Sequence, residues 1–433
     1  MSATTTTDGR LASGSAPQPA APDRLPVLRR PLTSYYLVLG CAAALVIIGL
    51  TMVFSASSVR SYARSGSSYT VLVTQAQWVA LGLPALALAR WLPVRTYRWL
   101  GYPLMLFSVL GLVAVLVPGV GRNVDGATRW IEMGPLSYQP SELAKLALAL
   151  WGADLLARKR RLLGQWKHLV IPLLPVTALL AGLIMLEPDL GTTIVLLLVT
   201  MALLWVVGAP LRLFAAISTT VAGLTGLLIY IEPYRMARFT GFLNPFADPL
   251  GRGFQAIQGL YALSSGGWWG IGLGASKEKW LGGLPNAHTD YVFAIIGEEL
   301  GLVGTFTVLL LFATLAYAGI RTARRTTDPF VRLAATAVTA WLVGQAVVNV
   351  GAVVGLLPIT GIPLPLISFG GSALLPTLFA VGMLASFART EPGAAAALAA
   401  RTGGPLSRWR RSRRAGTGRP PVPGGRRRRL VRR

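Results

Sequence analysis

Long stretches without a single charged residue constrain this chain more than any other feature. Residues 333–388 contain no Asp, Glu, Lys or Arg, and several apolar runs of similar character precede them. A helix crosses the hydrocarbon core of a bilayer with about 20 consecutive apolar residues. The chain of 433 residues is 53% hydrophobic and 13% charged, whereas about a quarter of the residues in a soluble domain carry charge. The sequence therefore predicts an all-α, polytopic integral membrane protein.

The lengths of the apolar runs predict ten transmembrane helices. Residues 34–388 form this membrane domain, and a large external loop, about 232–290, joins helices 7 and 8. The flanking segments 1–33 and 389–433 contain few apolar residues and are predicted to be disordered. The predicted spans are 34–54, 75–92, 99–117, 140–157, 169–186, 190–208, 212–231, 291–320, 333–354 and 371–388.

The net charge of +25, from 41 Lys and Arg against 16 Asp and Glu, would suggest nucleic-acid binding in a soluble protein. Here the basic residues gather in alternate loops, as expected for the cytoplasmic side of a membrane protein. Ten spans then place both termini in the cytoplasm and the loops 55–74, 118–139, 187–189, 232–290 and 355–370 outside. We expect no nucleic-acid partner.

The C-terminal tail, 389–433, carries 14 arginines and one acid, Glu391. Such a tail is either a topology signal or a tether to anionic membrane lipid or to acidic proteins. The remaining composition excludes other classes of site. One cysteine and two histidines leave no disulfide framework and no Cys/His metal cluster. The glycine run at 270–274 lacks the preceding strand of a dinucleotide-binding loop, so we expect no organic cofactor.

The strongest candidate site ends the external loop, where His288, Thr289 and Asp290 precede a predicted membrane helix. Asp290 has two interpretations. It is either an N-cap, favoured by the free N–H groups and dipole of the helix, or a general base whose proton affinity is raised by apolar surroundings. His288 either tunes Asp290 or is a polar residue of the membrane interface.

Further acids and bases lie inside or beside predicted spans, where ionisable residues suggest function by default. Glu298, which is followed by Glu299, lies about 12 Å along the helix from Asp290; the alternative is a structural interhelical hydrogen bond. Glu142 and Lys145 share a helix face at i,i+3 spacing and form either site support or an architectural ion network.

External arginines are the third group of candidates. Arg122 and Arg129 are plausible pyrophosphate clamps, because a guanidinium group binds phosphate oxygens in a bidentate manner. The short external turn at 187–189 is interpreted mainly as a turn and helix cap, with ion binding as the second interpretation.

Three motifs, at 126–145, 284–301 and 349–372, resemble the SEDS family of FtsW/RodA-type peptidoglycan polymerases, and the resemblance covers about 34–388. The external loop is more similar to the cell-division FtsW branch than to the elongation RodA branch. The resemblance implies that lipid II disaccharide-pentapeptide units are transferred from undecaprenyl pyrophosphate into β-1,4 glycan during septal wall synthesis. The essential Asp of the family's His-Thr-Asp motif corresponds to Asp290.

The resemblance also implies a class B penicillin-binding protein as partner and a place in the bacterial inner membrane at the division septum. A divalent cation, Mg or Mn, would help to stabilise the pyrophosphate leaving group. Ser368, Gly370 and Gly371 lie in a Pro- and Gly-rich segment that could shape the substrate entrance. Three alternatives stay open: an elongation-type polymerase, a lipid II flippase and a non-catalytic division scaffold.

Overall fold

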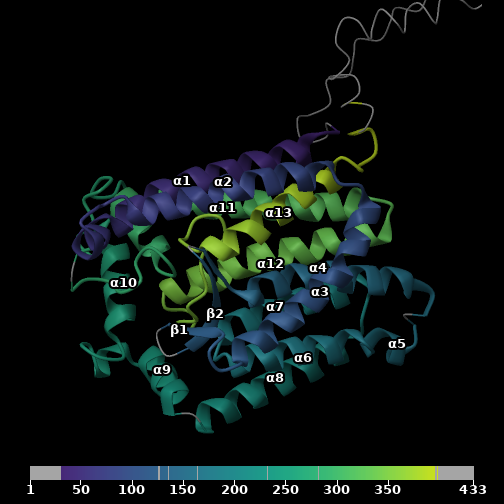
Figure 1. The fold of residues 1–433 in the computed structure, drawn as a ribbon, viewed down its shortest axis with the longest axis horizontal. Helices are drawn as coiled ribbons and strands as arrows, with labels where there is room; N and C mark the ends of the chain where they lie inside the picture. Colours follow the sequence, from purple (N-terminus) through teal and green to yellow (C-terminus); the bar gives the residue numbers. More distant parts are fainter. Residues whose placement is uncertain are drawn as a thin grey trace, which may run out of the picture.

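The computed structural model describes residues 31–124, 127–134, 136–162, 164–231, 233–280, 282–394 and 397. Most of them are helical, and the long helices run side by side along one axis of the molecule (Figure 1). The predicted disorder of 1–30 and 398–433 concerns residues outside these ranges. In chain order the helices are α1 (Thr33–Ser65), α2 (Thr70–Trp91), α3 (Val94–Leu116), α4 (Pro140–Arg158), α5 (Trp166–Val170), α6 (Leu173–Leu186), α7 (Leu190–Val206), α8 (Leu211–Ile231), α9 (Pro233–Leu243), α10 (Phe254–Ser265), α11 (Val292–Arg325), α12 (Pro329–Val353) and α13 (Gly371–Ala388).

Eight helical segments of the described chain are long and apolar enough to cross a membrane: α1, α2, α3, the combined Lys167–Leu186 segment, α8, α11, α12 and α13. This confirms a multi-pass helical membrane protein. The other two predicted spans, 140–157 and 190–208, are helical as α4 and α7. However, α7 has only 17 residues and α4 carries four charged residues, so the count of ten stays a prediction.

A small antiparallel sheet departs from the all-α prediction. It consists of β1 (Gly121–Val124), β2 (Ala127–Met133) and β3 (Leu136–Tyr138) in the order β1-β2-β3, within the segment predicted as an external loop. In the register, Arg122 faces Trp130 and Ile131 faces Tyr138. The β-branched and aromatic residues of β2 favour a strand. The loop prediction missed this short sheet because its strands of three to seven residues are too short for a clear periodic pattern.

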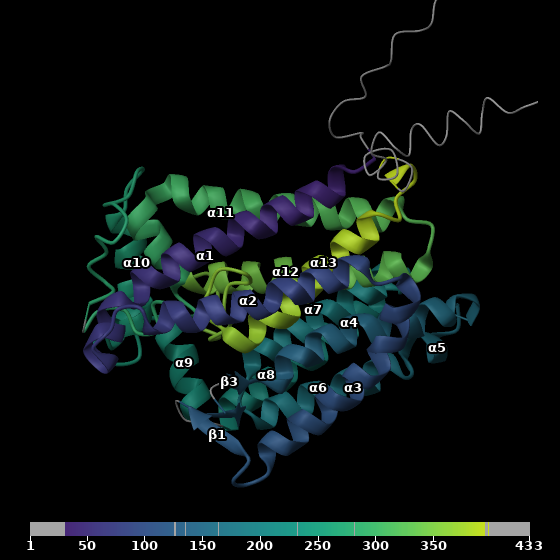
Figure 2. The same ribbon diagram turned by 45° about the horizontal axis from the view of Figure 1, so that its top comes forward.

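Two other predicted loops are largely helical. The segment 55–74 contains the last turns of α1 and the first turn of α2, and the segment 232–290 contains α9 and α10. The predicted boundaries were wrong here because hydropathy locates the apolar part of a helix, whereas helices extend into polar sequence beyond it. We call the end of the bundle that holds the sheet, α9 and α10 the sheet end. The opposite end, with the start of α1, α5 and the end of α13, is the basic end (Figures 1 and 2).

The core of the bundle surrounds α4, which packs against α3, α7 and α12. Its residues Ala147, Leu148 and Ala149 are fully buried. By contrast, α8 has no buried residue and packs against α9. Thus α4, the least apolar of the predicted spans, is an interior helix, and its neighbours bury three of its four charged residues, Glu142, Lys145 and Asp154.

Helix α11 is broken at Gly301, whose φ of 65° and ψ of −161° are not helical. The loop after α10 enters the break: Ile271 N–H donates to the Glu298 carbonyl at 3.0 Å, and Leu302 N–H donates to the Gly267 carbonyl at 2.9 Å. Backbone groups that the break frees are therefore satisfied by the loop. The first turns of α11, which follow Asp290, are held as a unit with this loop.

Candidate active site

An irregular segment, 355–370, lies between α12 and α13 and organises the sheet end of the bundle. Its residues Ile362, Leu364 and Ile367 are buried, so its backbone carbonyls need partners inside the protein. Two amide side chains of α12 supply them: Asn349 Nδ2 donates to the Ile362 carbonyl at 2.8 Å, and Gln345 Nε2 donates to the Pro363 carbonyl at 2.9 Å. Non-helical backbone is tolerated at membrane depth where the protein encloses it in this way.

Asp290 lies directly beside this segment. Its side chain is 9% exposed, and its Oδ1 accepts a hydrogen bond from Thr289 Oγ1 at 3.1 Å. Asn349 Nδ2 also donates to the Asp290 carbonyl at 2.7 Å, so one amide ties Asp290 to the 355–370 segment. The N-cap of α11 is Tyr291, so the interpretation of Asp290 as the N-cap is wrong. The helix begins at Val292, and the Asp290 carbonyl bonds to α12.

His288 contacts the same segment through Phe369. Its carbonyl accepts the Phe369 N–H at 2.9 Å, and the two rings lie 5.6 Å apart. Burial, followed by the positive charges of Arg60 and Arg64, lowers the pKa of His288 to about 4. The imidazole is therefore neutral at physiological pH.

Glu142 and Lys145 form the expected pair, at 2.8 Å, with both side chains almost fully buried. Lys145 Nζ also donates to Gln345 Oε1 at 2.9 Å, and Trp341 Nε1 donates to the same oxygen at 3.0 Å. These two donors orient the Gln345 amide so that its Nε2 points at the Pro363 carbonyl. The ion pair on α4 therefore acts on the 355–370 segment through one glutamine of α12.

Arg129, on β2, holds the turn between α6 and α7. Its guanidinium group donates to the carbonyls of Glu187, at 2.9 Å, and Pro188. Asp189 caps α7 by accepting the Thr192 N–H at 3.0 Å, which confirms the cap prediction. Both carboxylate oxygens of Glu187 are buried without a hydrogen-bond partner among the described residues. Burial, then the charge of Asp189, raises the pKa of Glu187 to about 8.

Two other predicted residues stand apart from Asp290. Arg122 pairs with Glu132 across the hairpin, and both side chains are more than half exposed. Glu298 is buried, but it binds the external loop rather than another helix: it accepts hydrogen bonds from Ser276 Oγ at 2.5 Å and Lys277 N–H at 2.8 Å. In this structure Glu298 anchors the loop that enters the break in α11.

The last predicted residues close the 355–370 segment. Ser368 Oγ accepts the Leu364 N–H at 2.8 Å and stabilises the turn. A side chain at Gly371 would overlap the Trp78 ring, whereas one at Gly370 would meet its nearest neighbours at 3.7 Å. Only Gly371 is thus required for close packing.

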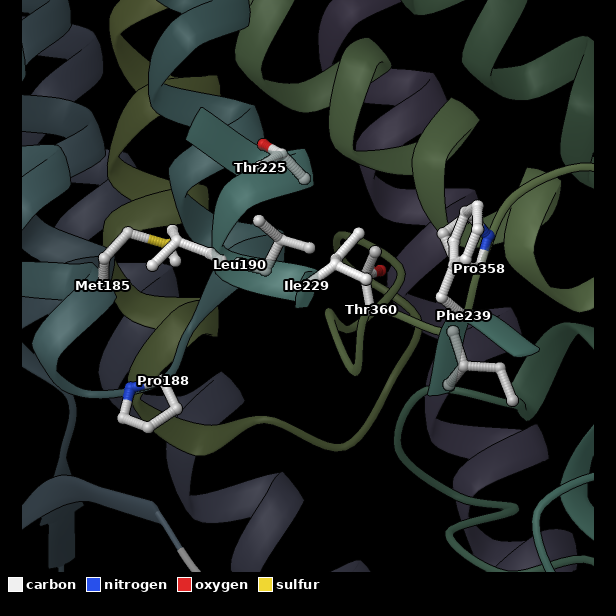
Figure 3. A pocket seen from close by; sticks show the side chains of 10 residues that line it. Met185, Pro188, Leu190, Thr225, Ile229, Phe239, Pro358 and Thr360 are labelled. Atoms are coloured by element: carbon white, nitrogen blue, oxygen red, sulfur yellow. The ribbon is translucent and has the colours of Figure 1, made fainter. Parts of the chain in front are cut away.

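An apolar pocket opens between α6, α8, α9 and the 355–370 segment (Figure 3). It borders the turn that Arg129 holds, since Pro188 is one of its lining residues. Its lining is mainly aliphatic, which suits a hydrocarbon chain. The lining residues are Met185, Pro188, Leu190, Thr225, Leu228, Ile229, Phe239, Pro358, Ile359 and Thr360.

The sequence analysis missed three contributors to this region: Gln345, Asn349 and Arg60. Arg60 donates to the Leu284 carbonyl at 3.1 Å and contributes to the lowered pKa of His288. A signal for the two amides was present, because Gln345 and Asn349 lie four residues apart in an uncharged span. Polar side chains at such spacing share one helix face and need partners there.

The fold and the site together define a polytopic helical membrane protein with a carboxylate, an arginine and an apolar pocket at one end. The chain belongs to the FtsW/RodA/SpoVE family of cell cycle proteins, whose profile matches residues 35–392. It is 44% identical over 373 residues to the probable peptidoglycan glycosyltransferase FtsW of Mycobacterium tuberculosis, covering 86% of this chain and 71% of that protein. It is 38% identical over 347 residues to the stage V sporulation protein E of Bacillus subtilis, covering 80% and 94%.

Solved structures show the same fold. A peptidoglycan synthase complex that coordinates polymerization and crosslinking contains a chain with a TM-score of 0.67 and 33% identity, with 81% of this chain and 96% of that chain covered. The rod shape determining protein RodA of Thermus thermophilus gives a TM-score of 0.61 and 30% identity, with 82% and 97% covered.

Proposed function

We propose that the protein is a peptidoglycan glycosyltransferase of the FtsW type that polymerises lipid II at the sheet end, which faces outward. One observation carries the site assignment: Asp290 is a buried carboxylate fixed at the start of α11 by Asn349 and Thr289. Family membership and the names of the relatives support the activity. The names also favour septal synthesis over elongation.

In the proposed reaction, Asp290 is the general base. It takes the proton of the 4-hydroxyl group of one sugar while that oxygen attacks C1 of the other sugar. The bond from C1 to the pyrophosphate oxygen breaks, its electron pair leaves with undecaprenyl pyrophosphate, and the donor carbon is inverted. General-base assistance of this kind contributes about 10²–10⁴-fold in rate.

The leaving pyrophosphate develops negative charge that cations must stabilise. Arg129 is the best placed of the predicted cations, because it lies at the turn beside the apolar pocket. That pocket is a fitting channel for part of the undecaprenyl chain. Lys145 is fully buried and engaged by Glu142 and Gln345, so we assign it a positioning role. Arg122 is more exposed and remains a candidate for the outer part of the pyrophosphate.

A divalent cation, Mg or Mn, is part of the proposal. The described residues contain no group of three or more His, Cys, Asp or Glu that could hold a metal ion. Mg²⁺, however, commonly uses one or two carboxylates and completes its shell with waters and substrate phosphates. Glu187 fits this requirement, because both of its buried carboxylate oxygens lack a partner within the described structure. When bound, the cation would supply Lewis-acid stabilisation of the leaving group.

We further propose that the basic end faces the cytoplasm, that both chain termini are cytoplasmic, and that a class B penicillin-binding protein is the partner. The similarity to a chain of a synthase complex that couples polymerization to crosslinking supports this partner. The Arg-rich tail lies outside the described residues, and its docking to division proteins rests on its charge alone.

The test replaces Asp290 with Asn in the purified full-length protein and measures glycan chains formed from lipid II. We expect a loss of at least about 10²-fold with an unchanged melting temperature. Asp248→Asn is the matched control, since Asp248 lies in the same external region and only caps the local turn at Gly251 and Arg252. Full activity of Asp290→Asn would exclude the general-base role and favour the flippase or scaffold alternatives.

A further inference from the structure

Two arginines at the basic end lack the carboxylate partners that their neighbours have. Arg90 lies in the last turn of α2 and Arg389 follows α13, and neither has an ion pair within the described part of the chain. Other arginines at this end do have one: Arg98 pairs with Asp328 at 2.8 Å, and Arg158 pairs with Asp154 at 2.6 Å. The positions of Arg90 and Arg389 are therefore not explained by an ion pair with a described residue.

Both guanidinium groups stack on one indole ring. The Cζ atoms of Arg90 and Arg389 lie 5.3 Å and 5.0 Å from the centre of the Trp91 ring. The Trp91 side chain is 66% exposed. Aromatic residues of this kind settle at the membrane–water interface, so the ring places both cations at headgroup depth.

The arrangement is held in place although its parts are far apart in sequence. Arg389 donates one hydrogen bond to the Arg90 carbonyl at 3.0 Å, and Ser386 Oγ donates to the Leu92 carbonyl at 3.2 Å. Arg90 uses one further donor on the Tyr35 hydroxyl at 3.4 Å. A guanidinium group has five N–H donors, and these bonds use one donor of each arginine. The Nε of Arg90 is buried and has no partner in the described structure.

We propose that Arg90, Trp91 and Arg389 form a binding site for the headgroup of an anionic phospholipid. Guanidinium groups match phosphate oxygens in a forked geometry, and basic pockets between helix ends on the cytoplasmic side are suited to anionic headgroups. The lipid phosphate takes the place of the missing carboxylate and bridges the ends of α2 and α13. This site lies at the end of the bundle opposite to Asp290 and is independent of the proposed chemistry.

The experiment titrates the purified full-length protein in detergent with dioleoyl phosphatidylglycerol and measures bound lipid by native mass spectrometry. Arg90→Gln/Arg389→Gln is expected to bind this lipid about tenfold more weakly than the wild type. The matched control, Arg324→Gln/Arg332→Gln, removes the same charge from exposed arginines at the same end and is expected to bind within about twofold of the wild type. Equal binding by wild type and the Arg90/Arg389 variant, or equal losses in both variants, would overturn the proposal.

Two further arms keep the test decisive. If the double variant does not fold, Arg389→Gln alone replaces it, with an expected loss of about threefold or more. Excess inorganic phosphate is added in the other arm: lipid that stays bound supports a lipid site, whereas lipid displaced by phosphate contradicts it.

Discussion

The two ends of the bundle hold their carboxylates in different ways. At the basic end, Asp154 and Asp328 each pair with an arginine. At the sheet end the carboxylates are of two kinds: Asp189 and Glu298 are held by hydroxyl and main-chain N–H groups, whereas Glu132 and Glu142 pair with Arg122 and Lys145. A carboxylate held by neutral donors keeps its charge available to a substrate or cation, whereas an ion pair neutralises it. The comparison teaches that both ends contain ion pairs, and that the sheet end also holds carboxylates that no cation of the described residues neutralises.

The largest effect among the supporting residues is expected for Asn349→Leu. The change leaves the Asp290 and Ile362 carbonyls without the donor that now serves both, at a cost of about 1–3 kcal/mol for each buried group. Misplacement of Asp290 should lower the kcat of glycan formation by about 10²-fold. Thr336→Val, near the start of α12, is the control. A variant with unchanged kcat would show that the sheet end does not depend on this amide.

A smaller effect is expected for Gln345→Glu. The carboxylate can still accept from Lys145 and Trp341, but it no longer donates to the Pro363 carbonyl. We expect kcat to fall about tenfold, with a smaller change in KM, because the residue positions the segment without contacting substrate. Gln345→Leu also removes the oxygen that accepts the hydrogen bond of the buried Lys145 ammonium group. This variant should therefore be less stable than Gln345→Glu. Equal stability of the two variants would contradict the network.

The pH dependence of stability tests the protonation of Glu187 at the sheet end. Its pKa is raised to about 8, so the native state retains a proton that the unfolded state has lost, and stability falls as pH rises from about 4.5 to 8. Glu187→Gln removes this dependence. The melting temperature of the wild type should therefore fall relative to that of Glu187→Gln between pH 5 and pH 8.

The change in melting temperature on adding Mg²⁺ is an independent test of Glu187. At pH 8, added Mg²⁺ should raise the melting temperature of the wild type more than that of Glu187→Gln, because a ligand stabilises the state that binds it. Equal responses of the two proteins would exclude Glu187 as a cation ligand.

The smallest effect is expected at the basic end. Asp328→Asn breaks a pair with Arg98 in which both side chains are more than one third exposed, and such pairs contribute about 0–1 kcal/mol. Polymerisation should be unchanged and the melting temperature should fall only slightly. A strong loss of glycan formation would break the proposed division between the two ends.

Much of the fold follows directly from the sequence. Uncharged runs located most of the long helices, and α4, with Glu142 and Lys145, was recognised as helical from its proline start and i,i+3 pair. The helices α9 and α10 were missed, since they lie in the predicted external loop. The sheet at 121–138 and the break at Gly301 were not predicted. Both depend on partners elsewhere in the chain: β2 needs its neighbouring strands, and the break is stable only because 267–272 occupies it. Local periodicity contains no information about such partners.

The candidate site divides in the same way. The sequence by itself determined which residues bear charge in apolar surroundings, and so it identified Asp290, Glu142, Lys145 and Glu298. Only the tertiary structure decided which charges are already neutralised and which are held by neutral donors. Asn349 and Asp290 are 59 positions apart, and Lys145 and Gln345 are 200 positions apart. Helix packing alone brings such groups within hydrogen-bond distance, and it thereby joins one aspartate, two amides and one buried ion pair through the 355–370 segment.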